Sequence, residues 1–200
     1  MITDVGIDLD GVLFDFSSVV TKHFSEYFGR EFPTPQGWEF YEEWGLSASA
    51  FYELLDKLTY EREIFNDASP IPKSIVGWHN LKEQGLKLHV ITHRSPSAYG
   101  QTVRWLERYR MIPDSLHFSG QKADILTAIA TDESASIDDY IEQYNDYERA
   151  GVRSYMFRQQ WNRGYPVRHV DTLPEFADAI KLYNQYWKME NKHAIETMVF

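Results

Sequence analysis

An apolar segment near the start of the chain, VGIDLDGVLF at residues 5–14, constrains the fold more than any other stretch. Its Val, Ile and Leu residues are typical of a buried β-strand. Asp8 and Asp10 interrupt this pattern, and an unpaired carboxylate in a buried strand is energetically expensive. The sequence therefore predicts a strand that ends in acidic side chains, which need either a compensating partner or a chemical function.

Short apolar segments alternate with amphipathic segments along the rest of the chain. We expect strands at residues 5–9, 86–93, 134–138 and 152–157. Helices are expected in the tail from Pro174 and at residues 73–84, 99–110, 122–130 and 140–151. Strands that alternate with helices are typical of a parallel sheet covered by helices. The predicted fold class is therefore α/β, with a Rossmann-like parallel sheet.

Residues 16–72 interrupt this alternation. Two amphipathic helical patterns flank a loop with the sequence FPTPQGW, and their apolar residues are Val20, Phe24, Tyr27 and Phe28, then Phe51, Leu54, Leu55 and Leu58. Two hundred residues are enough for one core plus such an insertion. The sequence predicts a core of residues 1–15 and 73–200, with a small helical cap of residues 16–72 inserted after the first strand.

Composition narrows the class of partner. The formal charge of −10 argues against duplex nucleic acid, which is bound mainly through Lys and Arg. It leaves room for a small phosphate ester, because a metal ion can attract one locally. The chain has no cysteine, its first residues lack the pattern of a signal peptide, and no apolar run approaches membrane-spanning length. A cytoplasmic protein without a membrane partner is expected.

Polar side chains are expected to meet at one edge of this sheet. Ligands of open α/β sheets bind outside the carboxyl ends of the strands, and the side chains predicted there are Asp8, Asp10, Thr92, Lys122, Asp138 and Asp139. Two carboxylates about 4 Å apart repel by roughly 4 kcal/mol at an effective dielectric near 20. A divalent cation would relieve this repulsion, and oxygen ligands favour Mg²⁺. The sequence thus predicts a Mg²⁺ site that takes a phosphate ester.

These residues resemble the motifs of the haloacid dehalogenase superfamily of phosphotransferases. The first motif corresponds to DLDGVL at residues 8–13 and the second to Thr92, which ends an apolar strand. The third corresponds to Lys122 at a helix start, and the fourth to the acidic pair in IDD at residues 137–139. All four occur in the family's order.

The resemblance implies a role for each of these residues. Asp8 would be the nucleophile that forms an aspartyl-phosphate, and Asp10 would serve as acid and then as base. Thr92 and Lys122 would hold the phosphoryl oxygens. The metal ligands would be Asp8, the backbone carbonyl of Asp10, Asp138 and, in an assisting role, Asp139.

A narrower resemblance concerns the substrate. DLDGVLFDF at residues 8–16 is similar to the opening of the 5′(3′)-deoxyribonucleotidases, in which the residue matching Phe16 stacks on the nucleobase. FRQQWNRGY at residues 157–165 resembles a late segment of that group. Two differences are the THRS sequence at residues 92–95, where that group has Thr-Ser-Pro, and a longer spacing from Lys122 to Asp138. These two differences leave open the alternative that the chain belongs to a sister group with another substrate preference.

Three further residues are candidates for contact with the substrate. Trp38 belongs to the aromatic residues of the expected cap, which could form a slot for a base. Arg94 either contacts the substrate phosphate or forms a surface ion pair, and His93 lies beside Thr92. The histidines of the chain show no metal-ligand spacing.

We therefore expect a Mg²⁺-dependent phosphatase of nucleoside monophosphates, with deoxynucleotides as the preferred substrates. The alternatives are a phosphatase of the same superfamily that acts on another small ester or on a polynucleotide 3′ end, and a catalytically silent binding protein. The expected C-terminal helix carries Phe176, Ile180, Tyr183 and Trp187 on one side. This apolar side is expected to pack on the core, and a homodimer is the other use we consider.

Overall fold

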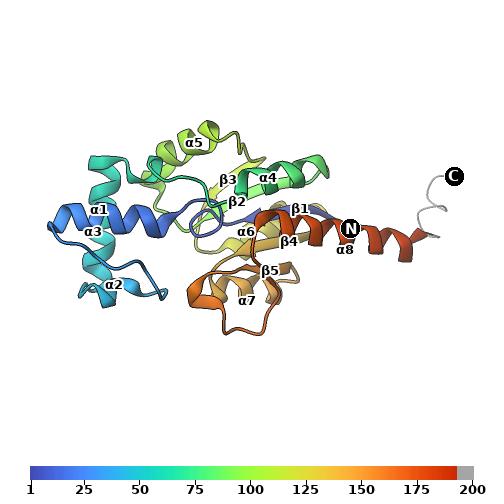
Figure 1. Cartoon of the computed structure of the whole chain (residues 1–200). Coiled ribbons are helices and arrows are strands. Elements are labelled where there is room, and N and C mark those ends of the chain that lie inside the picture. The colour runs from blue at the N-terminus through green and yellow to red at the C-terminus, as the bar shows by residue number, and fades with distance from the viewer. Residues whose placement is uncertain (193–200) are drawn as a thin grey trace.

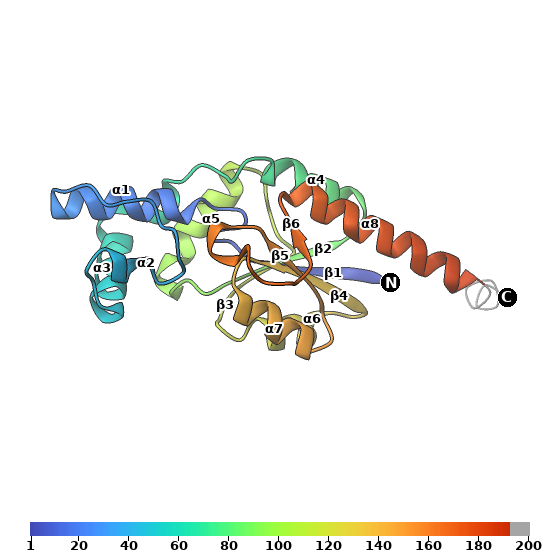
Figure 2. The same cartoon turned by 60° about the horizontal axis from the view of Figure 1, so that its bottom comes forward.

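The computed structural model describes residues 1–192 and contains a parallel sheet with the strand order β3-β2-β1-β4-β5-β6 (Figures 1 and 2). The strands are β1 (Ile2–Ile7), β2 (Lys87–Thr92), β3 (Ser115–Phe118), β4 (Glu133–Asp138), β5 (Arg153–Phe157) and β6 (His169–Val170). This order confirms the predicted Rossmann-like α/β fold. The order of the strands reverses between β1 and β4, which is where such sheets bind ligands.

Helices cover both faces of the sheet. One face carries α4 (Ser74–Glu83), α5 (Tyr99–Arg108) and α8 (Leu173–Glu190), and the other carries α6 (Lys122–Ile129) and α7 (Ile141–Arg149) (Figures 1 and 2). Gly6 allows α6 to lie directly on β1, because a Cβ atom there would come within 2.9 Å of Leu126 Cδ2. The central strands are therefore buried on both sides, and apolar residues fill most of these positions, with polar exceptions such as Asp4, His89 and Ser136.

Residues 16–66 form helices that lie beyond the carboxyl ends of the strands, at the opposite end of the sheet from the N-terminus (Figures 1 and 2). They are α1 (Phe16–Phe28), α2 (Phe40–Glu43), α3 (Ala48–Arg62) and the short 3₁₀ helix η1 (Ile64–Asn66). The Asp15 and Ser47 side chains cap the starts of α1 and α3 by accepting hydrogen bonds from backbone N–H groups. Buried side chains such as Phe24 and Leu58 join these helices to the main hydrophobic core.

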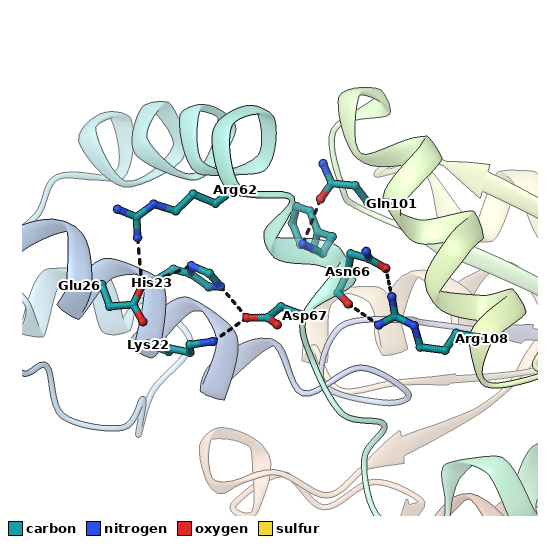
Figure 3. A network of polar contacts seen from close by, with 9 residues as sticks. Lys22, His23, Glu26, Arg62, Asn66, Asp67, Gln101 and Arg108 are labelled. Atoms are coloured by element: carbon teal, nitrogen blue, oxygen red, sulfur yellow. Dashed lines mark hydrogen bonds and ion pairs between the residues drawn. The ribbon is translucent and has the colours of Figure 1, made fainter.

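A polar network fixes the segment that leads from these helices back to the sheet (Figure 3). Asp67 lies 2.7 Å from Lys22 Nζ and 3.0 Å from His23 Nε2, so it is attached to α1. Gln101 of α5 accepts a hydrogen bond from the backbone N–H of Phe65 at 3.1 Å, and Arg108 donates to Asn66. Helix η1 is thereby held between α1 and α5.

Most of the expected strands and helices are present with slightly different ends, whereas β3, β6 and α2 were not expected. The tail helix α8 packs on α4, which confirms the expectation that its apolar side packs on the core. Among residues 1–192, every helix is too short or too polar to cross a membrane.

The buried face of α5 differs from the expected one. The spacing of Tyr99, Val103, Leu106 and Arg110 in the sequence predicts that they share one face of this helix. Leu106 is buried, but Tyr99 is 56% exposed and Arg110 lies beyond the end of the helix. The other buried residues are Gln101, Thr102 and Trp105. Hydrogen bonds compensate for this burial, since Gln101 donates to the Thr59 carbonyl at 2.6 Å and Thr102 accepts from Arg94 at 2.9 Å.

Candidate active site

Lys122 links two carboxylates at the point where the strand order reverses. Asp8 follows β1, and its backbone N–H bonds to Ile137 of the adjacent β4 at 3.0 Å. This pairing brings Asp8 next to Asp138, the last residue of β4. Lys122 Nζ, at the start of α6, lies 2.7 Å from an oxygen of each carboxylate. The structure thus brings together three residues that are far apart in the sequence.

Burial gives this cluster unusual electrostatics, since all three side chains are at most 7% exposed. Burial raises the pKa of Asp8 to about 7 against the opposing charge of Lys122, and Asp138 adds to the rise. Burial alone would lower the pKa of Lys122, but Asp138 and Asp8 raise it above its ordinary value. The ammonium therefore stays charged, and it compensates only part of the negative charge around it.

Asp139 adds a third carboxylate. Burial, followed by the charges of Asp8 and Asp138, raises the pKa of Asp139 well above its ordinary value. One oxygen each of Asp8, Asp138 and Asp139 lie within 4.8 Å of one another. Asp139 Oδ1 is buried and has no hydrogen-bond partner among the described residues. Gly11 leaves room for this carboxylate, because a Cβ atom at Gly11 would lie 2.0 Å from Asp139 Oδ2.

This arrangement fits a divalent cation. The donors are carboxylate oxygens, which suit hard cations, and Asp139 Oδ1 is an unused acceptor. Three buried carboxylates share one ammonium, so the site carries excess negative charge that a cation would compensate. The cluster comprises the three predicted metal ligands that would bind through a side chain, Asp8, Asp138 and Asp139.

The Asp10 side chain forms an ion pair with Arg94. Arg94 donates from Nε to one Asp10 oxygen at 2.8 Å and from Nη2 to the other at 2.6 Å. The Arg94 side chain is 1% exposed, and that of Asp10 is 24% exposed. Both residues line the same cavity as Asp8. Of the two roles considered for Arg94, the ion pair is the contact seen here, although it is buried and lies inside the site.

Thr92 and His93 are neighbours in the sequence, but of the two only His93 lines the cavity. Thr92 is fully buried, and its hydroxyl accepts a hydrogen bond from the backbone N–H of Arg94 at 3.3 Å. His93 is exposed and lines the cavity, with its ring close to Gly120. Thr92 ends β2, the strand next to β1, and its neighbour His93 reaches the cavity that Asp8 also lines.

The acidic cluster forms the polar end of a cavity of about 410 Å³ that extends under the helices of residues 16–66. Its apolar wall includes Phe16, Phe40, Tyr41, Phe51, Phe65 and Trp161. The Phe16 ring lies nearly parallel to that of Phe65, with 6.2 Å between ring centres and 12° between planes. A cavity with charged groups at one end and aromatic rings beyond them suits a ligand with an anionic group and a planar apolar part.

Trp38 also lines the cavity, and one face of its ring is covered. It stacks on Tyr140, with 4.1 Å between ring centres and 11° between planes. Tyr140 directly follows Asp139, so this stack joins the loop before α2 to the acidic cluster. Trp38 remains 43% exposed.

The sequence analysis missed several residues that support the acidic loops. Trp161 and Asn162 both donate to the backbone carbonyl of Asp139, and Gln159 donates to that of Gly11 at 2.7 Å. Gln143 lines the cavity with a buried Oε1 that has no hydrogen-bond partner among the described residues. The FRQQWNRGY segment contains Gln159, Trp161 and Asn162, and its resemblance to a late segment of the deoxyribonucleotidases was the one sequence signal for them. No sequence signal pointed to Gln143.

Comparisons with known proteins agree with this site. Residues 1–180 match the family model described as 5′ nucleotidase, deoxy (pyrimidine), cytosolic type C protein. A protein of Chlorobaculum tepidum named "Putative 5′(3′)-deoxyribonucleotidase" is 30% identical over 189 residues, which cover 90% of each chain.

Solved structures share the fold at low sequence identity. A haloacid dehalogenase-like hydrolase from Streptococcus pneumoniae superposes with a TM-score of 0.66 at 17% identity, covering 90% of this chain and 98% of the other. A haloacid dehalogenase phosphatase from Thermococcus onnurineus gives 0.59 at 14% identity, with 90% and 98% covered. Together with the family match, these likenesses show that the chain belongs to the 5′ nucleotidase, deoxy (pyrimidine), cytosolic type C family and is a phosphatase with the haloacid dehalogenase fold.

Proposed function

We propose that the protein is a Mg²⁺-dependent phosphatase that hydrolyses nucleoside monophosphates, with deoxynucleotides preferred, through an aspartyl-phosphate on Asp8. The observation that carries this proposal is the position of the Asp8–Lys122–Asp138 cluster at the polar end of an aromatic cavity. The names of the matched family and of the Chlorobaculum relative support the nucleotide as substrate.

The proposed chemistry has two steps. In the first, an Asp8 oxygen attacks phosphorus, the bond to the ester oxygen breaks, and Asp10 gives that oxygen a proton. In the second, a water molecule gives a proton to Asp10 and attacks phosphorus, which breaks the bond to Asp8 and releases phosphate. Asp10 has therefore regained the proton that it lost in the first step.

Other residues would stabilise charge during these steps. Lys122, whose ammonium lies 2.7 Å from Asp8 Oδ1, would attract the phosphoryl oxygens as they approach. Thr92 would donate a hydrogen bond to one of them. A divalent cation held by Asp8, Asp138 and Asp139, with the backbone carbonyl of Asp10, would neutralise negative charge on the phosphoryl group.

Residues 16–72 would act as the cap of this site, on the core of residues 1–15 and 73–200. Support comes from the position of α1–α3 beyond the carboxyl ends of the strands and from the residues that they contribute to the cavity wall. A cap excludes water and binds the leaving group. Phe16, Phe65 and the free face of Trp38 are the proposed contacts for the base.

Phosphate release tests this proposal. The protein is incubated with Mg²⁺, and separately with EDTA, on 5′- and 3′-nucleotides, sugar phosphates, a short oligonucleotide with a 3′-phosphate and p-nitrophenyl phosphate. The proposal predicts release that EDTA abolishes and that is fastest on nucleoside monophosphates. Faster release from sugar phosphates or from the oligonucleotide would reject the nucleotide assignment. Release that persists in EDTA would reject the metal requirement.

A further inference from the structure

Arg94 is a buried cation inside the proposed active site, and it forms an ion pair with the carboxylate of Asp10. Its Nε and Nη2 atoms donate to the two oxygens of Asp10, at 2.8 Å and 2.6 Å. Its Nη1 donates to Thr102 Oγ1 at 2.9 Å. A planar guanidinium that meets both oxygens of a carboxylate fixes its orientation as well as its position.

The rest of the fold holds Arg94 in place. The guanidinium carbon lies 4.2 Å from the ring centre of Phe14 and 4.1 Å from that of Phe65, so two aromatic rings cover the cation. Thr102, which holds Nη1, is itself fully buried in α5. Because Arg94 is 1% exposed and Asp10 is 24% exposed, the arginine is the fixed partner and Asp10 is the partner that faces the cavity.

We propose that Arg94 is a positioning residue that orients the Asp10 carboxyl for proton transfer, and that it does not bind the phosphate of the substrate. All three guanidinium nitrogens donate to Asp10 or Thr102, although Nη1 and Nη2 each keep one further N–H group. Two aromatic rings lie against the cation and its side chain is 1% exposed, which leaves little of it open to the cavity. This inference rests on the proposed function, because it assigns the support of the proposed acid and base.

The two chemical steps depend differently on this support. A nucleoside leaving group needs a proton from Asp10, whereas p-nitrophenolate is stable enough to leave without one. The second step needs Asp10 for every substrate, because the proton of the attacking water must be removed. A misplaced Asp10 should therefore slow the second step on p-nitrophenyl phosphate and leave the first step nearly unchanged.

The experiment compares Arg94→Met and Arg94→Lys with the wild type. Met keeps an apolar side chain beside the two rings and has no donor, and Lys restores the charge without the two-pronged geometry. Arg104→Met is the matched control. Arg104 belongs to α5 and also pairs with a carboxylate, but its partner is Glu63 and both side chains lie at the surface. Steady-state kinetics give kcat and KM, and rapid mixing with p-nitrophenyl phosphate measures the first turnover. Circular dichroism checks that each variant is folded.

For Arg94→Met with p-nitrophenyl phosphate we expect kcat to fall by about 10- to 100-fold, as for a misplaced catalytic group. KM should fall with it and not rise, because slowing only the second step lowers both constants. The first turnover should release p-nitrophenolate in a burst of about one equivalent per site, followed by slow turnover. Arg94→Lys should recover part of kcat, and Arg104→Met should match the wild type.

Other results would overturn the inference. A rise in KM without a burst would mean that Arg94 binds the substrate phosphate. Unchanged kcat in a folded Arg94→Met variant would mean that the ion pair only stabilises the fold. If Arg94→Met does not fold, Thr102→Val and Arg94→Lys decide between the same outcomes. An inactive wild type would reject the proposed function and this inference together, whereas an active wild type with unaffected variants would reject the inference alone.

Discussion

Lys122 Nζ lies 2.7 Å from Asp8 Oδ1 and 2.7 Å from Asp138 Oδ2, and it joins the ends of β1 and β4 through a single buried ammonium. This relationship connects the fold with the proposed chemistry. The parallel pairing of β1 with β4 places the two carboxylates side by side, and the start of α6 places the cation between them. We therefore expect the charge of Lys122 to contribute both to stability and to the approach of the proposed anionic substrate.

We predict that Lys122→Met destabilises the metal-free protein by about 3–5 kcal/mol, because removing one partner leaves buried carboxylates without compensation. Added Mg²⁺ should recover more stability in this variant than in the wild type, since the cation replaces part of the lost positive charge. Urea denaturation with and without MgCl₂ measures both quantities. Equal stabilities of the variant and the wild type in EDTA would contradict the prediction.

Asp139→Asn should have opposite effects on the metal-free and the metal-bound protein. Burial and the neighbouring carboxylates raise the pKa of Asp139, so a neutral amide should raise the melting temperature in EDTA. The same substitution should reduce the stabilisation by Mg²⁺, which for the wild type is about 2.7 kcal/mol when the concentration is 100 times Kd. Thermal melts over a MgCl₂ titration measure this, and an unchanged Mg²⁺ response would exclude Asp139 as a ligand.

Phe16→Ala tests the proposed base contact. Base stacking on an aromatic ring contributes about 1–3 kcal/mol, so KM for a nucleoside monophosphate should rise roughly 5- to 150-fold. The kcat value should change little, because the Phe16 ring carries no group that takes part in the chemistry. Tyr60→Ala is the control, since Tyr60 belongs to α3 and is 89% exposed. The idea fails if KM for p-nitrophenyl phosphate rises as much as KM for the nucleotide.

Asp4 is a buried carboxylate outside the active site, and it should make stability depend on pH. Burial alone would raise the pKa of Asp4, but hydrogen bonds from His89 and Thr3 lower it below the ordinary value of 3.8. The ionised group therefore adds stability above about pH 4, and this stability is lost as pH falls through the lowered pKa. Asp4 Oδ1 lies 3.0 Å from His89 Nε2, and His89 Nδ1 lies 2.7 Å from Ser115 Oγ.

We predict that Asp4→Asn lowers the free energy of unfolding by about 2–4 kcal/mol at pH 7 and by less in acid. Urea denaturation between pH 7 and pH 3 gives the difference at each pH. Asp146→Asn is the matched control, because Asp146 pairs with Arg149 at the surface and should cost less than about 1 kcal/mol. A difference that stays constant down to pH 3 would show that the charge of Asp4 is not responsible.

Apolar runs identified most of the sheet from the sequence. The expected strand positions gave β1, β2, β4 and β5, and the acidic residues after β1 and β4 then indicated where the site would be. The sequence did not predict strand β3, because SLHF is short and half polar and the strand lies at the edge of the sheet. Strand β6 has two residues and carries almost no pattern.

The sequence alone could not predict the polar contacts between residues that lie far apart along the chain. Nothing in the apolar pattern of residues 99–110 indicated that Gln101 and Thr102 are buried, but tertiary hydrogen bonds make their burial favourable. The pairing of Arg94 with Asp10 joins residues 84 positions apart, and the sequence offered both a substrate contact and an ion pair for Arg94. Only the positions of β1 and β2 in the sheet bring these two side chains together.

The central claim is that Asp8 is the nucleophile of a nucleoside monophosphate phosphatase. The most direct measurement is phosphate release from deoxynucleoside monophosphates with Mg²⁺ by the wild type and by Asp8→Asn, with circular dichroism to show that both are folded. We predict turnover by the wild type and none above background by Asp8→Asn. Turnover near the wild-type rate by a folded Asp8→Asn variant would contradict the mechanism.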